Sequence, residues 1–229
     1  MHPTLSPRED CLRIIRDRRS VRAFLDRPVP RETVERILET ARWAPSGVNT
    51  QPWEVCVVQG ETRERISAAM LAARAAEQPP RPDYHYYPEE WVEPWLGRRR
   101  ACGLALYGAL GIGRRDKARR LEAWNANYRF FGAPVGLFFF MDRRLQQGSW
   151  LDMGMFIENV MLAARALGLG TCPQASLAEY PDIVRRELGI ADDRLLLCGM
   201  ALGHPDPEAA VNRYRTEREP VASFSRWYG

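Results

Sequence analysis

The sequence predicts a single domain in which helices and strands alternate along the chain. Segments with apolar residues at three- and four-residue spacing, typical of amphipathic helices, are interspersed with short β-rich apolar runs. The chain has 229 residues, of which 45% are hydrophobic and 27% charged, so it can bury a sizeable core and lacks the composition of a disordered protein. We therefore expect one α/β-type domain over residues 1–229.

The first third of the chain alternates helical and extended patterns, which prolines and glycines separate from one another. The predicted elements are a helix from Leu12 that includes Val21 and runs into the basic segment 18–22, a helix over 34–41, a buried strand over 53–58 and a helix over 61–77.

Residues 78–127 have a different composition. Five prolines lie among tyrosines and tryptophans in the first part of this stretch, and we expect a helix only over 98–110. A long irregular stretch inside a compact domain is usually a functional loop. We therefore assign residues 79–131 to an aromatic-rich lid, or substrate wall, inserted into the domain.

The second half of the chain contains the strongest helical pattern. Ser149 and Asp152 fit a capping box at its start, apolar residues between 153 and 167 lie on one face, and Gly168 ends it. The other predicted elements are a buried strand over 134–141, a loop over 173–176, a helix over 181–188, a strand over 195–202 and an irregular, arginine-rich tail from residue 205.

Several classes of catalytic site are excluded by the residue types present. Lys117 is the only lysine among 33 basic residues and lies in a charged cluster, which argues against Schiff-base and P-loop chemistry. The five cysteines form no C-x-x-C pair, the three histidines form no H-E-x-x-H pair, and G-x-S-x-G is absent. We therefore expect no metal site and no nucleophilic triad.

Charge and hydropathy favour a cytoplasmic protein. The net charge is only +4, with arginines interspersed among acidic residues, so no nucleic-acid partner is expected. The longest apolar run, residues 133–141, is far shorter than the ~20 residues that a membrane span requires. Residues 1–20 carry charges throughout, unlike a signal peptide, and the odd number of cysteines fits a reducing compartment.

Three separate segments look specialised. Residues 18–22 read Arg-Arg-Ser-Val-Arg, whose guanidinium groups and hydroxyl suit a phosphate. Residues 44–53 read Ala-Pro-Ser-Gly-Val-Asn-Thr-Gln-Pro-Trp, which contains more amide side chains than a turn requires. Arg-Glu-Pro follows at 218–220. Taken singly, the first segment is more typical of a solvated basic helix end, and the third carries no functional signal.

In this order, the three segments resemble the FMN-dependent nitroreductases. The resemblance covers the whole chain and extends to the helix after Ser149, to Gly-Thr-Cys-Pro-Gln at 170–174 and to residues 203–207. The middle of the chain is similar to the bacterial subgroup that acts on bulky nitroaromatics. The resemblance implies an α+β fold with a central, mostly antiparallel sheet flanked by helices. It also implies an intertwined homodimer whose active site is shared across the interface.

The resemblance further implies which residues hold the cofactor, FMN. Arg18, Ser20 and Arg218 match positions that hold its phosphate. Arg22 matches a basic position at the pyrimidine edge of the flavin, where a cation stabilises the negative charge of the reduced form. The other matched positions are Arg19, Pro45, Ser46, Asn49, Gln51, Pro173, Gln174, Ala175 and Ser176.

Two of these groups have distinct implied roles, and the chain departs from the family at two positions. Residues 45–51 match a segment that reaches the flavin of the partner subunit, and residues 173–176 match a loop over the flavin, with the Ala175 N–H near its N5. Many relatives have glutamate in place of Ala175 and lysine in place of Thr216. Phosphate binding then depends more on Arg18 and on the tail arginines at 213 and 215.

The implied reaction is a ping-pong oxidoreduction that needs no catalytic side chain. NAD(P)H, with NADPH slightly favoured, would reduce the FMN, and a nitroaromatic compound or quinone would then take two electrons in the same pocket. Aromatic residues of the insertion could stack on a flat substrate. The candidates are Tyr86, Trp91, Trp95 and Phe130.

Other functions stay open on the sequence. A quinone or flavin reductase and a flavin-dependent dehalogenase would use the same fold. A non-catalytic flavin-binding redox sensor and a polyanion-binding protein belong to different classes.

Overall fold

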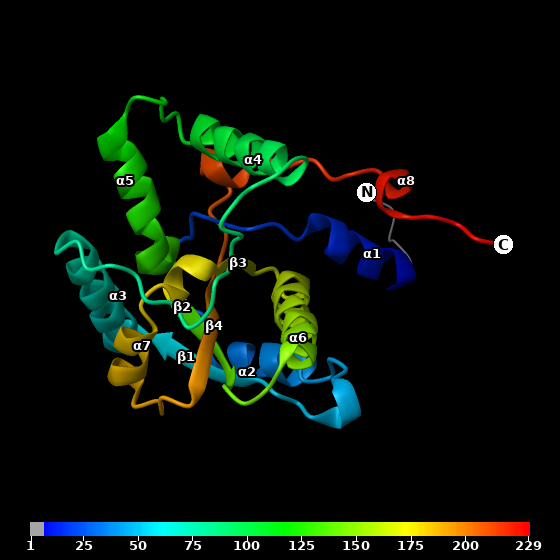
Figure 1. The fold of residues 1–229 in the computed structure, drawn as a ribbon, viewed down its shortest axis with the longest axis horizontal. Coiled ribbons are helices and arrows are strands. Elements are labelled where there is room, and N and C mark those ends of the chain that lie inside the picture. The colour runs from blue at the N-terminus through cyan, green and yellow to red at the C-terminus, as the bar shows by residue number, and fades with distance from the viewer. Residues whose placement is uncertain (1–6) are drawn as a thin grey trace.

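Four strands form one antiparallel sheet in the order β1-β2-β4-β3 in a computed structural model that describes residues 7–229 (Figure 1). The first six residues, which begin the charged segment 1–20, lie outside the described residues. The strands are β1 (Glu54–Gln59), β2 (Val135–Asp142), β3 (Gly170–Gln174) and β4 (Arg194–Gly203). The α+β fold with an antiparallel sheet is therefore confirmed.

Helices cover both faces of this sheet, as Figure 1 shows. One face packs against α2 (Arg31–Ala41) and α6 (Gln147–Ala166), and the other against α3 (Gly60–Ala75) and α7 (Pro181–Leu188). Side chains of β2 alternate between the two cores: Phe139 faces the first and Phe138 the second. Because both faces are buried, β2 appears in the sequence as an unbroken apolar run.

A β-bulge adjusts the register of the two central strands. Phe139 pairs with Cys198, but Phe140 pairs with Leu196, so Leu197 is an extra residue on β4. The bulge lets Leu197 and Met200 face the same core although they are three positions apart, a spacing that in a regular strand points side chains to opposite faces.

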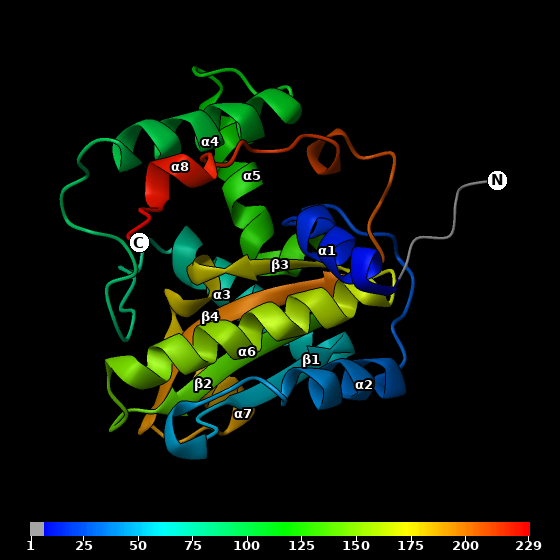
Figure 2. The same ribbon diagram turned by 90° about the vertical axis from the view of Figure 1, so that its right-hand side faces the viewer.

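The remaining helices lie outside this three-layer core. The long ones are α1 (Pro7–Asp17), α4 (Trp95–Ala109) and α5 (Lys117–Asn125). Figure 2 shows α4 and α5 beyond the β3 edge of the sheet. The short helices are η1 (Gly47–Asn49), η2 (Ala126–Gly132), η3 (Ala175–Ala178), η4 (Ala210–Asn212) and α8 (Val221–Phe224). No helix in the described part of the chain is both long and apolar enough to cross a membrane.

The first predicted helix is too long. It ends at Asp17, and Val21 lies in an extended segment that forms a bridge between Ser20 and Thr171 of β3. Val21 is buried, so its apolar side chain fills the core from a strand-like segment rather than from a helix.

The prediction of a capping box at the start of the long helix is wrong. Helix α6 begins at Gln147, so Ser149 and Asp152 lie inside it. The buried carboxylate of Asp152 instead accepts a hydrogen bond from the Gly47 N–H, with both oxygens at 3.3 Å. A contact between residues 105 positions apart cannot be read from local spacing.

Three other elements differ from expectation. Part of the loop predicted over 173–176 belongs to β3, a strand of five residues that is too short for an alternating pattern. Strand β1 lies at the edge of the sheet and is half exposed rather than buried. Helix α5 was not expected, because its sequence is dominated by charged residues.

Candidate functional site

The basic segment 18–22 runs beside β3. The Val21 N–H donates to the Thr171 carbonyl at 2.9 Å. Gly170 permits this approach, since a Cβ there would lie 2.7 Å from a methyl group of Val21. Burial raises the pKa of the Cys172 thiol, and the nearby Arg22 and Ser20 oppose this shift. Ser20 and Arg22 therefore lie close to Cys172 on β3.

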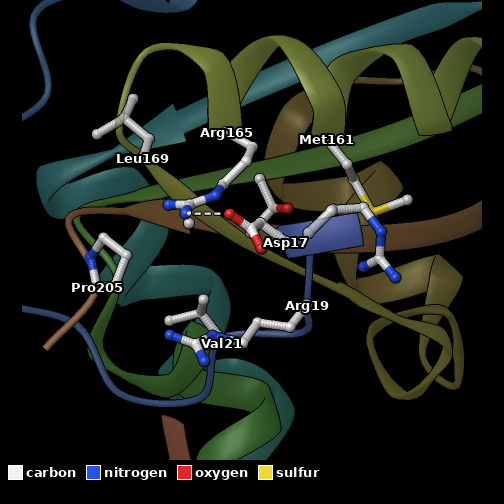
Figure 3. A pocket seen from close by; sticks show the side chains of 10 residues that line it. Asp17, Arg19, Val21, Met161, Arg165, Leu169 and Pro205 are labelled. Carbon is white, nitrogen blue, oxygen red and sulfur yellow. Dashed lines mark ion pairs between the residues drawn. The ribbon is translucent and has the colours of Figure 1, made fainter. Parts of the chain in front are cut away.

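Guanidinium groups gather where this segment leaves α1. Asp17 pairs with Arg165 of α6 at 3.6 Å (Figure 3). It also pairs with Arg215 of the tail at 3.5 Å. Partial burial lowers the pKa of Arg19, and the charges of Arg215 and Arg165 lower it further. Arg18 pairs with Glu158 at 3.4 Å. The cluster holds more cations than carboxylates, so it suits a small multivalent anion such as a phosphate.

The cavity beside this cluster is small. It has a volume of about 20 Å³ and is lined in part by Arg18, Arg19 and Gly170. Figure 3 shows Arg165 of α6 and Arg19, which follows the end of α1, among the side chains that line it. A cavity of this size holds a water molecule rather than a flavin. Any larger ligand must therefore bind on the open side of the cluster.

Two tail residues that the sequence analysis missed hold Arg22 in place. The Arg22 N–H donates to Oδ1 of Asn212 at 2.9 Å, and its Nη1 donates to the Tyr214 hydroxyl at 3.3 Å. These contacts span 190 and 192 residues, and an asparagine and a tyrosine in a polar tail give no local signal.

The other end of β3 carries unpaired polar atoms. Gln174 is buried and its Nε2 donates to the Asn127 carbonyl at 2.7 Å, but its Oε1 has no partner among the described residues, and neither does Oγ of Ser176. Buried polar atoms without a partner are rare in folded proteins. Gln174 is three residues from Thr171 along the strand, or about 10 Å. The guanidinium cluster therefore lies near the first end of β3, and the unpaired atoms of Gln174 and Ser176 lie at the other end.

Residues 45–51 form a strained turn. Val48, Asn49 and Gln51 have φ values of 46°, 59° and 50°, in the left-handed region. The Gln51 N–H donates to Oγ of Ser46 at 3.0 Å, which closes the turn. Such conformations cost about 1–3 kcal/mol each and concentrate at ligand sites. Val48 of this turn is fully exposed.

The turn lies far from the basic segment of the same chain. Gly47 is bound by Asp152 near the start of α6, whereas Asp17 is bound by Arg165 near its end. Thirteen residues of helix separate these anchors, which corresponds to about 20 Å. The structure therefore places the segment with Arg18, Ser20 and Arg22 beside β3, the strand that leads into residues 173–176, but it does not place residues 45–51 there.

The aromatic-rich segment 79–131 is anchored near its start by a buried carboxylate. The Asp83 carboxylate accepts hydrogen bonds from Arg185 at 2.7 and 3.1 Å and from Arg143 at 2.7 Å. The next residue, Tyr84, donates its hydroxyl proton to the Leu197 carbonyl at 2.6 Å. The rings of Tyr84, Tyr86, Tyr87 and Trp91 then follow one another, with centroids 4.7–6.3 Å apart.

The predicted substrate residues differ in exposure. Tyr86 and Trp95 are more than half exposed and Trp91 is half-buried. Phe130 is 0% exposed, and its ring packs edge-on against Phe138. A fully buried ring offers no free surface to a substrate, so Phe130 belongs to the core.

Arg218 stands apart from the other predicted phosphate ligands. It is exposed, and its Nη1 donates to Oγ1 of Thr216 at 2.8 Å and to the Glu217 carbonyl at 2.9 Å. Arg215, in contrast, donates to the carbonyls of Arg16 at 2.8 Å and Asp17 at 3.3 Å, next to the basic segment.

Comparison with known proteins assigns the chain to a family. The profile of the Nitroreductase family matches residues 15–204. The chain belongs to the nitroreductase family. Among curated nitroreductases, it is 43% identical over 213 residues to the chloronitrobenzene nitroreductase of Comamonas testosteroni, covering 93% of this chain and 94% of that protein.

Two further nitroreductases resemble it closely. The nitrobenzene nitroreductase of Ectopseudomonas oleovorans is 43% identical, with 92% of this chain and 95% of that protein covered. The crystal structure of the FMN-dependent nitroreductase NfnB from Mycobacterium smegmatis in complex with NADPH has a TM-score of 0.93 and 37% identity, with 98% of this chain and 100% of that chain covered. The nitroreductase fold is therefore shown over almost the whole chain.

Proposed function

We propose that this chain is an FMN-dependent nitroreductase that uses NADPH to reduce nitroaromatic compounds. The observation that carries the proposal is the row of Arg18, Ser20 and Arg22 along β3, which ends at the unpaired polar atoms of Gln174 and Ser176. Relatives that share about 40% of the sequence over their full length are named for nitroaromatic substrates.

The residues present fit FMN. The guanidinium cluster at the end of α1 suits the phosphate, with Arg18 and Ser20 as ligands and Arg215 beside them. Arg215 would replace the lysine that many relatives have at the position of Thr216. Arg218 would have to break its hydrogen bond to Thr216 in order to bind the phosphate. The unpaired atoms of Gln174 and Ser176 suit the polar edge of the flavin ring.

Bound FMN would supply the transfer of two electrons from NADPH to the nitro group, in a ping-pong sequence. The chain provides the fixed charge of Arg22 and the backbone N–H of Ala175 at the ring. Tyr86, Trp91 and Trp95 of the 79–131 insertion form one wall for a flat substrate. Quinones share the flat shape and the need for two electrons, so we expect them as second acceptors.

We further propose a homodimer in which residues 45–51 of each chain complete the site of the other. These residues lie about 20 Å along α6 from the basic segment of their own chain. Helix α6 exposes Leu151, 73% accessible, and Met155 one turn later, and the turn that Asp152 of the same helix binds exposes Val48. Adjacent exposed apolar side chains of this kind mark protein–protein interfaces.

We place the protein in the cytoplasm. All five cysteines are free thiols, including buried Cys172, which fits a reducing compartment.

The visible absorption spectrum of the purified protein tests the proposed function. A yellow protein that bleaches on anaerobic addition of NADPH, and recolours with nitrobenzene, is the expected result. A protein that takes up no FMN would overturn the proposal. Bleaching without recolouring by nitroaromatics or quinones would favour a redox sensor, and a haloaromatic panel in the same assay would detect a dehalogenase. The same titration with NADH measures the preference between the two donors.

A further inference from the structure

Arg22 is held by neutral groups. Its Nη1 donates hydrogen bonds to the Tyr214 hydroxyl at 3.3 Å and to the Ser20 carbonyl at 3.4 Å. The neighbouring Arg18 and Arg215, in contrast, pair with the carboxylates of Glu158 and Asp17. Within residues 7–229, no acidic side chain forms an ion pair with Arg22. Its charge is therefore kept in place without being neutralised.

The backbone of Arg22 is fixed as firmly as its side chain. Asn212 is 2% exposed, and its Oδ1 accepts the Arg22 N–H at 2.9 Å. Its Nδ2 donates to the carbonyls of Ala23 at 2.8 Å and Asp206 at 2.9 Å. Both ends of this amide are engaged, so the side chain cannot rotate without leaving buried polar groups unpaired.

Tyr214 follows Asn212 by two residues, so one short tail segment supplies both contacts to Arg22. Burial raises the pKa of Tyr214, while the charge of Arg22 acts in the opposite direction. The phenol thus stays neutral at physiological pH and accepts a hydrogen bond without cancelling the arginine charge.

We infer that Tyr214 is a positioning residue for flavin reduction: its hydroxyl orients the Arg22 guanidinium toward the edge of FMN that becomes negative on reduction. The inference rests on the proposed function, which places Arg22 at that edge. A group that acts only through Arg22 changes the binding of reduced FMN more than that of oxidised FMN, because only the reduced form carries the charge that Arg22 meets.

The test compares Tyr214→Phe with the unmodified protein in anaerobic titrations of the apoprotein with oxidised and reduced FMN. We expect the Kd for reduced FMN to rise roughly 3- to 10-fold, the effect of losing one hydrogen bond of ordinary strength, and that for oxidised FMN to rise by less than about 2-fold. Tyr228→Phe is the matched control, since Tyr228 is an exposed tyrosine of the same tail, and it should change neither constant.

A double-mutant cycle separates positioning from a general structural role. In an Arg22→Ala background, Tyr214→Phe should have no further effect on the ratio of the two constants. Equal weakening of both forms, or an undiminished effect in that background, would overturn the inference.

The two proposals fail in different ways. An unmodified protein that binds no FMN overturns the proposed function, and this inference with it. An unmodified protein that binds FMN and reduces nitroaromatics, with an unchanged ratio of constants in Tyr214→Phe, overturns this inference alone.

Discussion

Arg18 and Arg22 lie four residues apart but have different surroundings. Arg18 lines the recess at the end of α1 together with Arg19, where the proposed phosphate site lies. Arg22 instead contacts the Tyr214 hydroxyl, and its charge acts on the Cys172 thiol of β3. In the proposed function these two arginines therefore have different roles: Arg18 would bind the phosphate, and Arg22 would stabilise the reduced cofactor.

Substitution of these two arginines should separate the purposes. Arg18→Ala should raise the Kd for FMN about 10- to 100-fold, the effect expected for lost hydrogen bonds to a charged group. Arg22→Ala should slow reduction by NADPH about 10-fold with a smaller change in the Kd for FMN, since it removes a positive charge that stabilises the reduced, negatively charged flavin. Flavin fluorescence gives the first quantity and anaerobic stopped-flow absorbance the second. Exposed Arg36→Ala is the control, and equal effects of both variants on both quantities would contradict the division of roles.

At the scale of elements, the buried Asp83 joins the start of the insertion to α7 and β4. Its side chain is 6% exposed and that of Arg185 is 7% exposed. Burial alone would raise the pKa of Asp83, but hydrogen bonds from Arg185, Arg143 and the Leu196 N–H outweigh it, so that the pKa lies below its usual value. This ion pair should set the position of the aromatic residues that follow.

Asp83→Asn should lower the free energy of unfolding by about 3 kcal/mol at pH 7, because it leaves Arg185 without its buried partner. Since the folded-state pKa is depressed, the carboxylate stabilises the fold above the unfolded pKa of ~3.9 and loses this contribution as pH falls through the folded value. Urea unfolding at pH 7 and pH 3 should therefore show a smaller difference between variant and unmodified protein at the lower pH. Exposed Asp26→Asn is the control, and a difference that is independent of pH would contradict this account.

Packing between η2 and β2 depends on a glycine. A Cβ at Gly136 would lie 2.5 Å from the ring of Phe130, which is fully buried. Gly136→Ala should cost about 1–3 kcal/mol through overpacking, and thermal unfolding would detect the loss. Gly103 of α4 has no atom within 4 Å of its Cβ position, so Gly103→Ala should instead stabilise its helix by up to about 1 kcal/mol. Equal melting temperatures for the two variants would show that Phe130 adapts.

Within one molecule, residues 45–51 lie about 20 Å along α6 from the basic segment, so a site that uses both segments requires two chains. If each site combines segments from two chains, a heterodimer of an Arg18→Ala/Arg22→Ala chain with an Asn49→Ala/Gln51→Ala chain contains one intact site and one doubly defective site. We expect about half of the unmodified activity per dimer, whereas either homodimer should be weakly active. Co-expression with two affinity tags yields the heterodimer. No recovery above the homodimers would show that each site lies within one chain.

Elements with a local pattern could be predicted from the amino-acid sequence alone. Periodicity over 34–41 and 153–167 identified α2 and α6, and unbroken apolar runs identified β2 and β4, because burial of a helix face or of both faces of a sheet selects residues at fixed spacing. The order of three short motifs identified the family. Short or polar elements such as β3 and α5 escaped detection, since five residues or a charged surface leave no period to read.

Contacts between residues that are distant in the sequence could be known only from the folded chain. Arg22 is hydrogen-bonded to Asn212, 190 positions away, and Asp152 accepts a hydrogen bond from Gly47 instead of capping a helix. The fold also places Phe130 in the core instead of the substrate wall. A hydrogen bond or a buried ring depends on where folding brings two segments in space, and the spacing of residues within either segment carries no information about the other. The sequence therefore predicted the family and its chemistry, whereas the fold determined which side chains, Asn212 and Tyr214, contact Arg22.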